Sequence, residues 1–324
     1  MVVRTTTAEA QLPIPCLAAL VARNPGFAHP FEHHFADLLD SYRIRWRYES
    51  TSFLLSRRPD GSLAECFTPD FYLPDLRTYV ELTSMRQPLV TRKHRKLRRF
   101  RVAFPDVRVV MLYRRDYHRM LSAWSGMSKP STPAQLGDLG LTAGRLLYAD
   151  QTLSSQMDEH AFQIALRYEG IGEQPLLVGL GHGGRRVAAD LASRLASRLL
   201  VPEVDDLVLD VRGGRTHALR QRAFPLSGRT VTLVAPMVST GLTTEFAVGW
   251  LRRRGTVSVD VCALLDRASA RVVSIPLRYA SLPAPIEHLV GYGLDLRHEF
   301  RHLTSVSVLD DPYDGPLLAG GHGS

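Results

Sequence analysis

Short apolar runs that alternate with helix-length segments are the feature of this sequence that most restricts its fold. The runs are residues 176–180, 206–211, 230–235, 257–264 and about 289–291. Helical patterns cover about 151–168 and 186–199, and another follows the small-residue turn at 239–241. Parallel strands need crossover connections of this kind, because the chain must return to the starting edge of the sheet. We therefore predict a mainly parallel α/β sheet flanked by helices over residues 145–324.

The first part of the chain shows a different order of elements. Residues 29–42 place five apolar side chains on one helical stripe: Phe31, Phe35, Leu38, Leu39 and Tyr42. Short strands, a strongly basic helix, another strand and a last helix follow at 44–48, 52–56, 66–73, 78–83, 88–103, 107–113 and 116–124. Residues 123–144 are rich in Ser, Gly, Pro and Thr, as in a linker. We expect one domain over 1–122 and a second over 145–324.

Several bulk properties limit the class of protein. No stretch of about 18 uninterrupted apolar residues is present, so we expect no membrane span. The first 13 residues lack the continuous apolar core of a signal peptide. Cys16, Cys66 and Cys262 lie far apart and show no metal-ligand spacing. These features favour a cytoplasmic protein, and they leave open whether it forms a homo-oligomer.

The positive charge is confined to the first part of the chain. Residues 1–125 hold 20 Lys and Arg against 12 Asp and Glu, whereas residues 126–324 hold 20 of each. The whole net charge of +8 therefore belongs to the first part. Such a distribution favours an anionic partner there, most often nucleic acid, DNA or RNA. The alternative is a solvated basic surface without a partner.

The segment FTPDFYLPDLRTYVELTS at 67–84 holds two acids that a hairpin would bring together. Asp70 lies in a Pro-Asp bend before one strand, and Glu81 lies in the next strand. Glu32, from the first helix, could join them. Carboxylate oxygens of this kind bind hard cations such as Mg²⁺ or Mn²⁺, which polarise a phosphodiester and activate water. The alternative is that Asp70 occupies an ordinary turn and that Glu81 is an exposed strand residue.

Residues 29–120 resemble the PD-(D/E)xK restriction-endonuclease-like superfamily, which implies an α/β nuclease fold. The resemblance implies an acid on the first helix (Glu32), the aspartate of a Pro-Asp pair (Asp70) and the glutamate of an E-x-K strand (Glu81). Asp70 and Glu81 would hold the metal. Thr83 stands where the family has its catalytic lysine, so the positive charge must come from elsewhere.

The basic helix at 88–103 offers a replacement for that lysine. Lys93 falls on the apolar stripe of this helix, and Lys96 lies at the edge of the stripe. An inward lysine favours a carboxylate partner, because an isolated buried charge is costly. The alternative is a Lys93 whose stem packs while its ammonium group reaches solvent. The outward arginines suit contact with nucleic-acid phosphates and are Arg92, Arg95, Arg98 and Arg99.

The segment VTLVAPMVSTGLTTEF at 231–246 reads as a buried strand, a tight turn and the start of a helix. A small-residue turn that opens a helix can hold a phosphate group, because backbone N–H groups and the helix dipole point at one place. Just before the turn stands Ala235-Pro236, where such a site usually carries carboxylates for a sugar or a metal.

Three motifs over about 145–312 together resemble hypoxanthine-guanine phosphoribosyltransferases and imply a type I phosphoribosyltransferase fold. They are GLGHGG at 179–184, VSTGLTT at 238–244 and HLVGYGLDLRHEFRHL at 288–303. The resemblance implies a pyrophosphate loop and a 5′-phosphate loop. The first is Gly181, His182, Gly183 and Gly184, and the second is Ser239, Thr240, Gly241, Leu242 and Thr243.

The resemblance also implies roles for single residues. Arg267 stands where a lysine reads the exocyclic oxygen of the purine, and His288 stands where an aromatic side chain stacks on the base. Asp295 matches a metal-site aspartate, and Arg301 matches an arginine on the pyrophosphate side. A flexible catalytic loop is expected near 212–216. The ligands implied are a purine nucleotide or phosphoribosyl pyrophosphate (PRPP), with Mg²⁺.

The same domain departs from the family at its acids. Ala235 and Pro236 replace two adjacent acids that hold the ribose hydroxyls, and Ser239 replaces the presumed general base. Each lost charged hydrogen bond costs about 1.5–3 kcal/mol, and loss of a general base costs about 10²–10⁴ in rate. We therefore expect a domain that binds a nucleotide but catalyses poorly, or a structural remnant.

Three hypotheses for the whole chain follow from these patterns. The first is a metal-dependent nuclease-like protein coupled to a degenerate phosphoribosyltransferase that binds a purine nucleotide or PRPP. The second is an active purine phosphoribosyltransferase, working in salvage, with an accessory nucleic-acid-binding domain. The third is a non-catalytic, nucleotide-responsive protein that binds DNA or RNA.

Overall fold

The computed structural model divides the chain into two compact units, Met1–Arg114 (unit 1) and Arg115–Ser324 (unit 2). The described residues are 14–15, 26–60, 62–83, 87–113, 142–212, 215–220, 224–279, 281–294, 300 and 302–310. No helix among them is both long enough and apolar enough to cross a membrane. The predicted helix at 116–124 and most of the predicted linker, 123–144, lie outside these residues.

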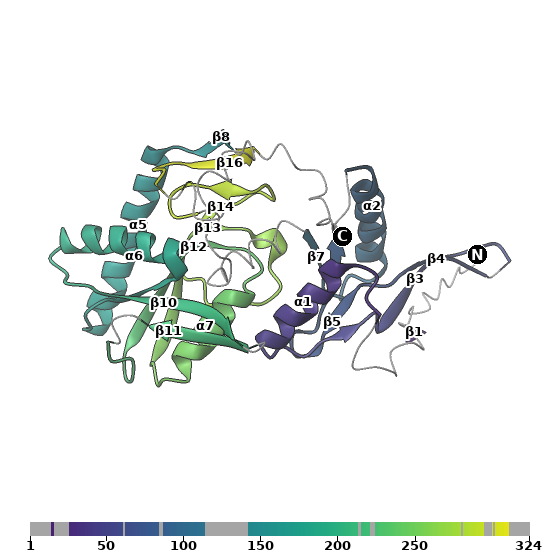
Figure 1. Ribbon diagram of the computed structural model, residues 1–324, viewed down its shortest axis with the longest axis horizontal. Coiled ribbons are helices and arrows are strands. Elements are labelled where there is room, and N and C mark those ends of the chain that lie inside the picture. The colour runs from purple at the N-terminus through teal and green to yellow at the C-terminus, as the bar shows by residue number, and fades with distance from the viewer. Residues whose placement is uncertain are drawn as a thin grey trace, which may run out of the picture. The chain divides into compact units, whose positions relative to one another are not determined.

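Unit 1 is built around a four-stranded sheet with the order β2-β5-β6-β7. Figure 1 labels β5 and β7 of this sheet, together with the helices α1 and α2. Its strands are β2 (Arg47–Tyr48), β5 (Phe71–Leu73), β6 (Thr78–Thr83) and β7 (Val109–Tyr113). β5 pairs antiparallel with β6, whereas β6 pairs parallel with β7. Helix α2 (Gln87–Ala103) connects the parallel pair. Helix α1 (Pro30–Ser41) precedes the sheet, and all five residues of its predicted apolar stripe are buried.

A second, three-stranded sheet completes unit 1. It has the order β1-β3-β4, with β1 (Ile14–Pro15), β3 (Thr51–Arg57) and β4 (Leu63–Phe67). The prediction of one strand over 66–73 was wrong, because β4 ends at Phe67 and β5 begins at Phe71. Pro69 explains the break, since proline has no N–H to donate to a sheet ladder. Phe53, Phe67, Phe100 and Met111 form part of the core between these strands and α2.

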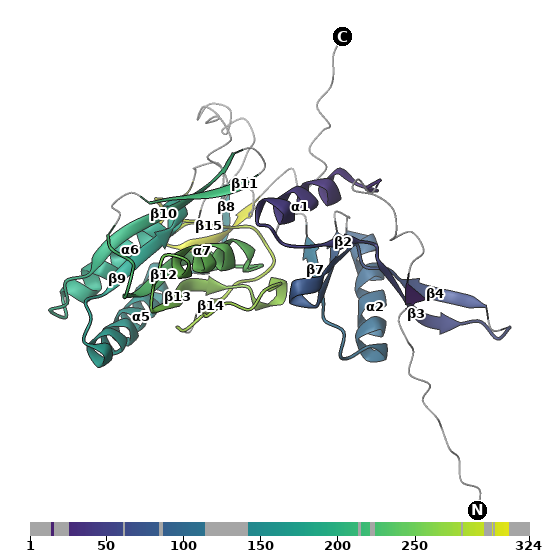
Figure 2. The same ribbon diagram turned by 90° about the horizontal axis from the view of Figure 1, so that it is seen from below.

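Unit 2 contains a six-stranded sheet with the order β11-β10-β9-β12-β13-β14 (Figure 2). Its strands are β9 (Leu176–Leu180), β10 (Glu203–Arg212), β11 (Arg215–Arg220), β12 (Thr230–Val238), β13 (Ser258–Asp266) and β14 (Leu282–Pro283). Every neighbouring pair is parallel except the β10–β11 hairpin. The predicted mainly parallel α/β sheet is confirmed.

Helices cover both faces of this sheet. Helices α5 (Asp150–Ile171) and α6 (Gly181–Ala196) pack on one face, and α7 (Leu242–Arg252) packs on the other. Leu177 belongs to the core under α5 and α6, whereas Leu176 and Val178 belong to the core under α7. This alternation follows from the two-residue period of a strand.

A separate three-stranded sheet holds the last described strand. It has the order β15-β16-β8, with β15 (Leu289–Val290), β16 (Val306–Asp310) and β8 (Thr142–Tyr148). The apolar run at 289–291 was predicted to be a strand of the parallel sheet. It belongs instead to this separate sheet. A strand of two residues shows no alternation of apolar and polar side chains, so the sequence does not indicate which sheet it joins.

Two further differences affect the candidate site of unit 2. Gly181–Gly184 form the first turn of α6, although the sequence placed them in a loop before a helix at 186. β12 continues through Ala235 and Pro236 to Val238, beyond the predicted end at 235. Glycine has a low helix propensity. We therefore attribute the helical conformation of Gly181–Gly184 to the close packing around this turn.

Candidate functional sites

The carboxyl groups of Asp70 and Glu81 lie close enough in unit 1 for the charge of Glu81 to act on Asp70. Asp70 follows Pro69 in the bend before β5, and its Oδ2 accepts a hydrogen bond of 2.6 Å from the backbone N–H of Leu82. Glu81 lies in β6 and is only 5% exposed. The hairpin predicted from the sequence therefore brings the two acids together, and Glu81 is buried rather than exposed.

Lys93 of α2 points into this pair of acids. Its Nζ lies 2.6 Å from Glu81 Oε1 and donates a hydrogen bond of 2.8 Å to the carbonyl oxygen of Leu82. The ammonium group thus contacts the strand on which Thr83 replaces the family lysine. Lys96 lies one turn further along α2, with Nζ 5.9 Å from the centre of the Phe67 ring. Its charge also acts on Glu81, although more weakly than that of Lys93.

The pKa values of both acids are raised, although Lys93 lies beside them. Burial and, second, the charge of Glu81 raise the pKa of Asp70 to about 8. Burial also raises the pKa of Glu81, although the charge of Lys93 acts to lower it. Glu81 Oε2 and Thr83 Oγ1 are buried and have no hydrogen-bond partner among the described residues. Buried carboxylate and hydroxyl oxygens of this kind suit a hard divalent cation, which binds oxygen ligands and supplies positive charge.

Glu32 does not complete a three-carboxylate cluster. Its Oε2 accepts hydrogen bonds from the backbone N–H groups of Ala28 and His29 and from the hydroxyl of Tyr48. The carboxylate therefore serves the capping box at the start of α1. In the described part of the chain, no three His, Cys, Asp or Glu side chains form a metal-binding group. The expectation that three acids converge on one metal is corrected to two acids and a lysine.

The arginines of α2 divide into two groups. Arg95 and Arg98 are exposed, as the helical pattern predicts. Arg99 forms an ion pair with Glu65 of β4. Arg92 lies in α2, but its side chain is outside the described part of the structure. The structure therefore places Arg95, Arg98 and Arg99 at the surface, and of these three Arg99 is paired with an acid.

The predicted 5′-phosphate loop of unit 2 lies between β12 and α7. Gly241 caps α7 with φ of 81°, a left-handed conformation that only glycine adopts readily. The carbonyl oxygen of Thr240 accepts a hydrogen bond of 2.9 Å from the N–H of Val272, which holds the loop in place. Ser239 Oγ is buried without a hydrogen-bond partner among the described residues. Leu242 and Thr243 begin α7, so the loop opens onto the helix N-terminus as predicted.

The predicted pyrophosphate loop is held by close backbone contacts. A Cβ on Gly183 would lie 2.4 Å from the carbonyl oxygen of Gly293 and 2.9 Å from Cγ of Pro236. A Cβ on Gly184 would lie 2.5 Å from the carbonyl oxygen of Val234. These glycines therefore allow the start of α6 to approach both β12 and the turn at Gly293.

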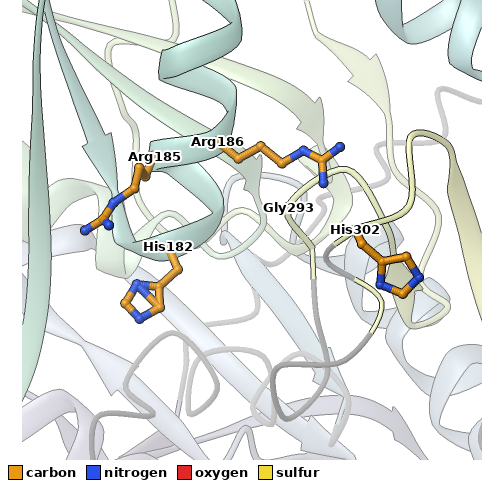
Figure 3. Close-up of a pocket in the computed structure, with 5 residues that line it drawn as sticks. All are labelled: His182, Arg185, Arg186, Gly293 and His302. Carbon is orange, nitrogen blue, oxygen red and sulfur yellow. The ribbon is translucent and has the colours of Figure 1, made fainter.

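A pocket of about 450 Å³ opens beside this turn (Figure 3). Its lining residues are His182, Arg185, Arg186, Gly293 and His302. Arg185 pairs with Asp206, with 2.8 Å between Nε and Oδ2. Arg186 extends toward the side of Gly293 and His302, and its guanidinium lies 5.3 Å from the ring centre of Tyr292. The pocket is rich in N–H donors, which suits an anion.

Three of these residues are not among those predicted from the sequence: Arg185, Arg186 and His302. Arg185 and Arg186 directly follow the Gly-rich turn, so two adjacent arginines at the start of a helix were the available signal. His302 directly follows Arg301, which the family resemblance places on the pyrophosphate side, so the signal available for His302 was its neighbour.

Other predicted residues of unit 2 have different surroundings. Arg267 is fully buried, and its Nη2 donates a hydrogen bond of 2.9 Å to the carbonyl oxygen of Glu287. His288 is partly exposed, and its carbonyl oxygen accepts a hydrogen bond of 2.7 Å from the N–H of Leu309. Asp295 and Arg301 lie outside the described residues, as do 213–214 of the predicted catalytic loop.

Comparison with known proteins gives relatives for about half of the chain. No protein-family model matches. A hypoxanthine-guanine phosphoribosyltransferase from Streptococcus mutans is 28% identical over 173 residues, which cover 52% of this chain and 93% of that protein. A hypoxanthine phosphoribosyltransferase from Escherichia coli is 27% identical over 179 residues, covering 53% and 94%. The bifunctional protein TilS/HprT of Listeria innocua is 27% identical over 168 residues, covering 51% of this chain and only 26% of its own length.

Solved structures give similar coverage. A hypoxanthine-guanine phosphoribosyltransferase from Bacillus anthracis covers 52% of the chain with a TM-score of 0.47 and 23% identity. A hypoxanthine phosphoribosyltransferase from Trypanosoma cruzi covers 52% with a TM-score of 0.48 and 25% identity. The sequence relatives show that about half of the chain is a phosphoribosyltransferase domain similar to hypoxanthine-guanine phosphoribosyltransferases. The quoted motifs of that family all lie in unit 2.

Proposed function

We propose that unit 2 binds a purine nucleotide or PRPP and converts it poorly. The observation that supports this proposal most is the combination of a formed phosphate loop with a basic pocket. The loop at 239–241 offers backbone N–H groups at the start of α7, and the pocket offers the side chains of Arg185 and Arg186. Both suit phosphate groups.

Weak turnover follows from the residues between these two features. Ala235 and Pro236 have no side-chain acceptor for ribose hydroxyls, and Ser239 is a poor general base because its hydroxyl is not basic near neutral pH. Mg²⁺ would neutralise part of the charge of a bound pyrophosphate group. Asp295 is the residue we expect to assist the metal there.

We propose for unit 1 a metal-dependent cleavage of nucleic acid. The contact between Lys93 and Glu81, at 2.6 Å beside Asp70, supports this proposal. Asp70 and Glu81 would hold Mg²⁺ or Mn²⁺, which polarises a phosphodiester and makes a water molecule more acidic. Lys93 would orient Glu81 and stabilise negative charge on the phosphate. Arg95 and Arg98 would contact the nucleic-acid backbone without reading its sequence.

A second candidate function is purine salvage by an active phosphoribosyltransferase, with unit 1 as an accessory nucleic-acid-binding domain. Its support is the similarity to the Streptococcus mutans and Escherichia coli enzymes over nearly their whole lengths. A third candidate is a non-catalytic, nucleotide-responsive protein that binds DNA or RNA. The replaced acids of unit 2 favour the first proposal over the second, and the ordered Lys93–Glu81 contact favours it over the third.

Two assays on the full chain separate the three candidates. The first is calorimetric titration with GMP, IMP and PRPP, followed by a turnover assay with hypoxanthine or guanine, PRPP and Mg²⁺. Binding without turnover is the expected result, and robust turnover would favour salvage.

The second assay incubates mixed DNA and RNA with the protein and Mg²⁺ or Mn²⁺. We expect cleavage that disappears in Asp70→Asn and Glu81→Gln but persists in Glu65→Gln, a matched control in the same unit. Binding without any cleavage would favour the third candidate, and cleavage that survives loss of both acids would exclude this site.

A further inference from the structure

A row of three side chains crosses the sheet of unit 1 from one strand to the next. The strands β2, β5 and β6 are neighbours, and their register pairs Arg47 with Tyr72 and Tyr72 with Tyr79. Paired residues on adjacent strands lie side by side on one face of a sheet. These three residues therefore form a continuous row, which we call the tyrosine row (Arg47, Tyr72 and Tyr79).

The tyrosine row lies next to the acids because a strand has a two-residue period. Tyr79 and Glu81 are two residues apart in β6, so their side chains are on the same face, about 7 Å apart along the strand. Their contacts agree with this placement: Tyr79 packs against the core that contains Phe100 of α2, and Glu81 contacts Lys93 of the same helix. A phosphodiester held at Asp70 and Glu81 would therefore have its neighbouring nucleotide within reach of the row.

The rings of Tyr72 and Tyr79 form a stack that is fixed at the Tyr79 end. Their centres are 4.5 Å apart, and their planes meet at 30°. Tyr79 packs edge to face against Phe53, and its hydroxyl donates a hydrogen bond of 3.3 Å to Thr51 Oγ1. Tyr72 is half-buried, so part of its ring is in contact with solvent. A ring that is already ordered loses less conformational entropy when it binds a ligand.

Positive charge lies beside this stack. Arg47 is exposed, is the cross-strand neighbour of Tyr72, and lies near enough for its charge to act on Tyr79. Aromatic rings bordered by a cation are the combination on which unpaired bases stack while their phosphates contact the positive charge. A base inside a duplex has its faces covered by its neighbours, so it cannot use such a platform unless it leaves the stack.

We propose that the tyrosine row binds an unpaired base next to the scissile phosphate, so that the substrate of unit 1 is single-stranded nucleic acid, DNA or RNA. This inference rests on the proposed cleavage of nucleic acid and specifies its substrate class. The base would stack on the ring of Tyr72, and Arg47 would contact an adjacent phosphate. Stacking tolerates every base, so the row selects an unpaired strand and not a sequence.

The test measures binding of the full chain to labelled oligonucleotides by fluorescence anisotropy, in EDTA so that no strand is cut. Single-stranded DNA, single-stranded RNA and a DNA duplex of the same sequence are compared. Tyr72→Ala should weaken binding of the single strands about 5- to 150-fold, the effect of one lost base–aromatic stack, and should leave the duplex almost unchanged. Tyr72→Phe keeps the ring and should bind like the wild-type protein. Trp46→Leu is the matched control, because Trp46 packs against Phe71, whose side chain is on the opposite face of β5 from Tyr72.

A single strand made of abasic nucleotides gives a second measurement. It keeps the phosphate charge but has no base to stack, so the wild-type protein should bind it as weakly as Tyr72→Ala does, and the two losses should not add. Circular dichroism checks that each variant is folded. Unchanged binding of single strands by Tyr72→Ala, an equal loss for strand and duplex, or a loss in Tyr72→Phe as large as in Tyr72→Ala would overturn the inference and leave the proposed cleavage intact. Tyr72-dependent binding without any cleavage in Mg²⁺ or Mn²⁺ would support the inference and refute the cleavage, whereas no binding of any nucleic acid would refute both.

Discussion

The contact between Lys93 and Glu81 permits a quantitative test of unit 1. Lys93→Met keeps the length of the side chain but removes its charge. Glu81 is then buried, 5% exposed, with no ammonium group beside it. Breaking a buried ion pair costs about 3–5 kcal/mol. Because the Lys93 side chain is 27% exposed, solvent screens part of this effect, and we expect a loss of about 2–3 kcal/mol in the free energy of unfolding.

The sign of the pH dependence follows from the pKa of Glu81. Burial raises this pKa in the folded protein above the ordinary value of 4.5. A raised carboxyl pKa means that folding is favoured while the group is protonated and is penalised once the pH exceeds the unfolded pKa. Loss of Lys93 raises the folded pKa further. The destabilisation should therefore be largest above neutrality and should shrink in mild acid.

Urea-dependent hydrogen exchange of peptides from β6 and β7 measures the stability of unit 1 within the full chain. Lys96→Met is the control, because Lys96 makes a cation–π contact worth about 0.5–1 kcal/mol and its charge acts on Glu81 more weakly than that of Lys93. The double variant Glu81→Gln with Lys93→Met should recover most of the loss, since the buried carboxylate that Lys93 neutralises is removed together with it. A loss for Lys93→Met below about 1 kcal/mol, typical of a surface pair, or one equal to that of Lys96→Met, would refute the reasoning.

Three further predictions use the same structure. Gly183→Ala should weaken nucleotide binding, because the new Cβ would lie 2.4 Å from the Gly293 carbonyl oxygen, and calorimetry measures this loss. Gly170→Ala is the control, because no atom lies within 4 Å of a Cβ at that position. The double variant Arg95→Gln with Arg98→Gln should weaken nucleic-acid binding and reduce the slope of log K against log salt by up to about 2, and an unchanged slope in gel-shift titrations would contradict it. Cys262 is fully buried, and burial raises its pKa to about 12, so iodoacetamide should modify it only after unfolding, as mass spectrometry would show.

The mainly parallel sheet of unit 2 could be predicted from the sequence because it depends on local periodicity. Each apolar run between two helix-length segments has few alternatives to a buried strand, and β9 begins and ends where the pattern placed it, at Leu176 and Leu180. The phosphate turn at 239–241 was equally readable, since the small residues that permit it are contiguous. The apolar face of α1 follows from helical spacing in the same way.

The tertiary structure decided which distant residues meet. Helical spacing placed Lys93 on the apolar stripe of α2, but only the packing of α2 on β6 determines that its Nζ contacts Glu81 rather than solvent. Glu32 had the correct position in the family pattern, yet its carboxylate is bound by the N–H groups at the start of its own helix.

The basic pocket of unit 2 shows the same distinction most clearly. Arg186 and His302 are separated by more than a hundred residues, and they line one cavity because the turn at Gly293 packs against the turn at Gly183. Periodicity describes which face of a helix or strand is apolar, so it locates each element against a core. It carries no information about which two loops approach each other, because that depends on the register of strands and the packing of whole elements in three dimensions.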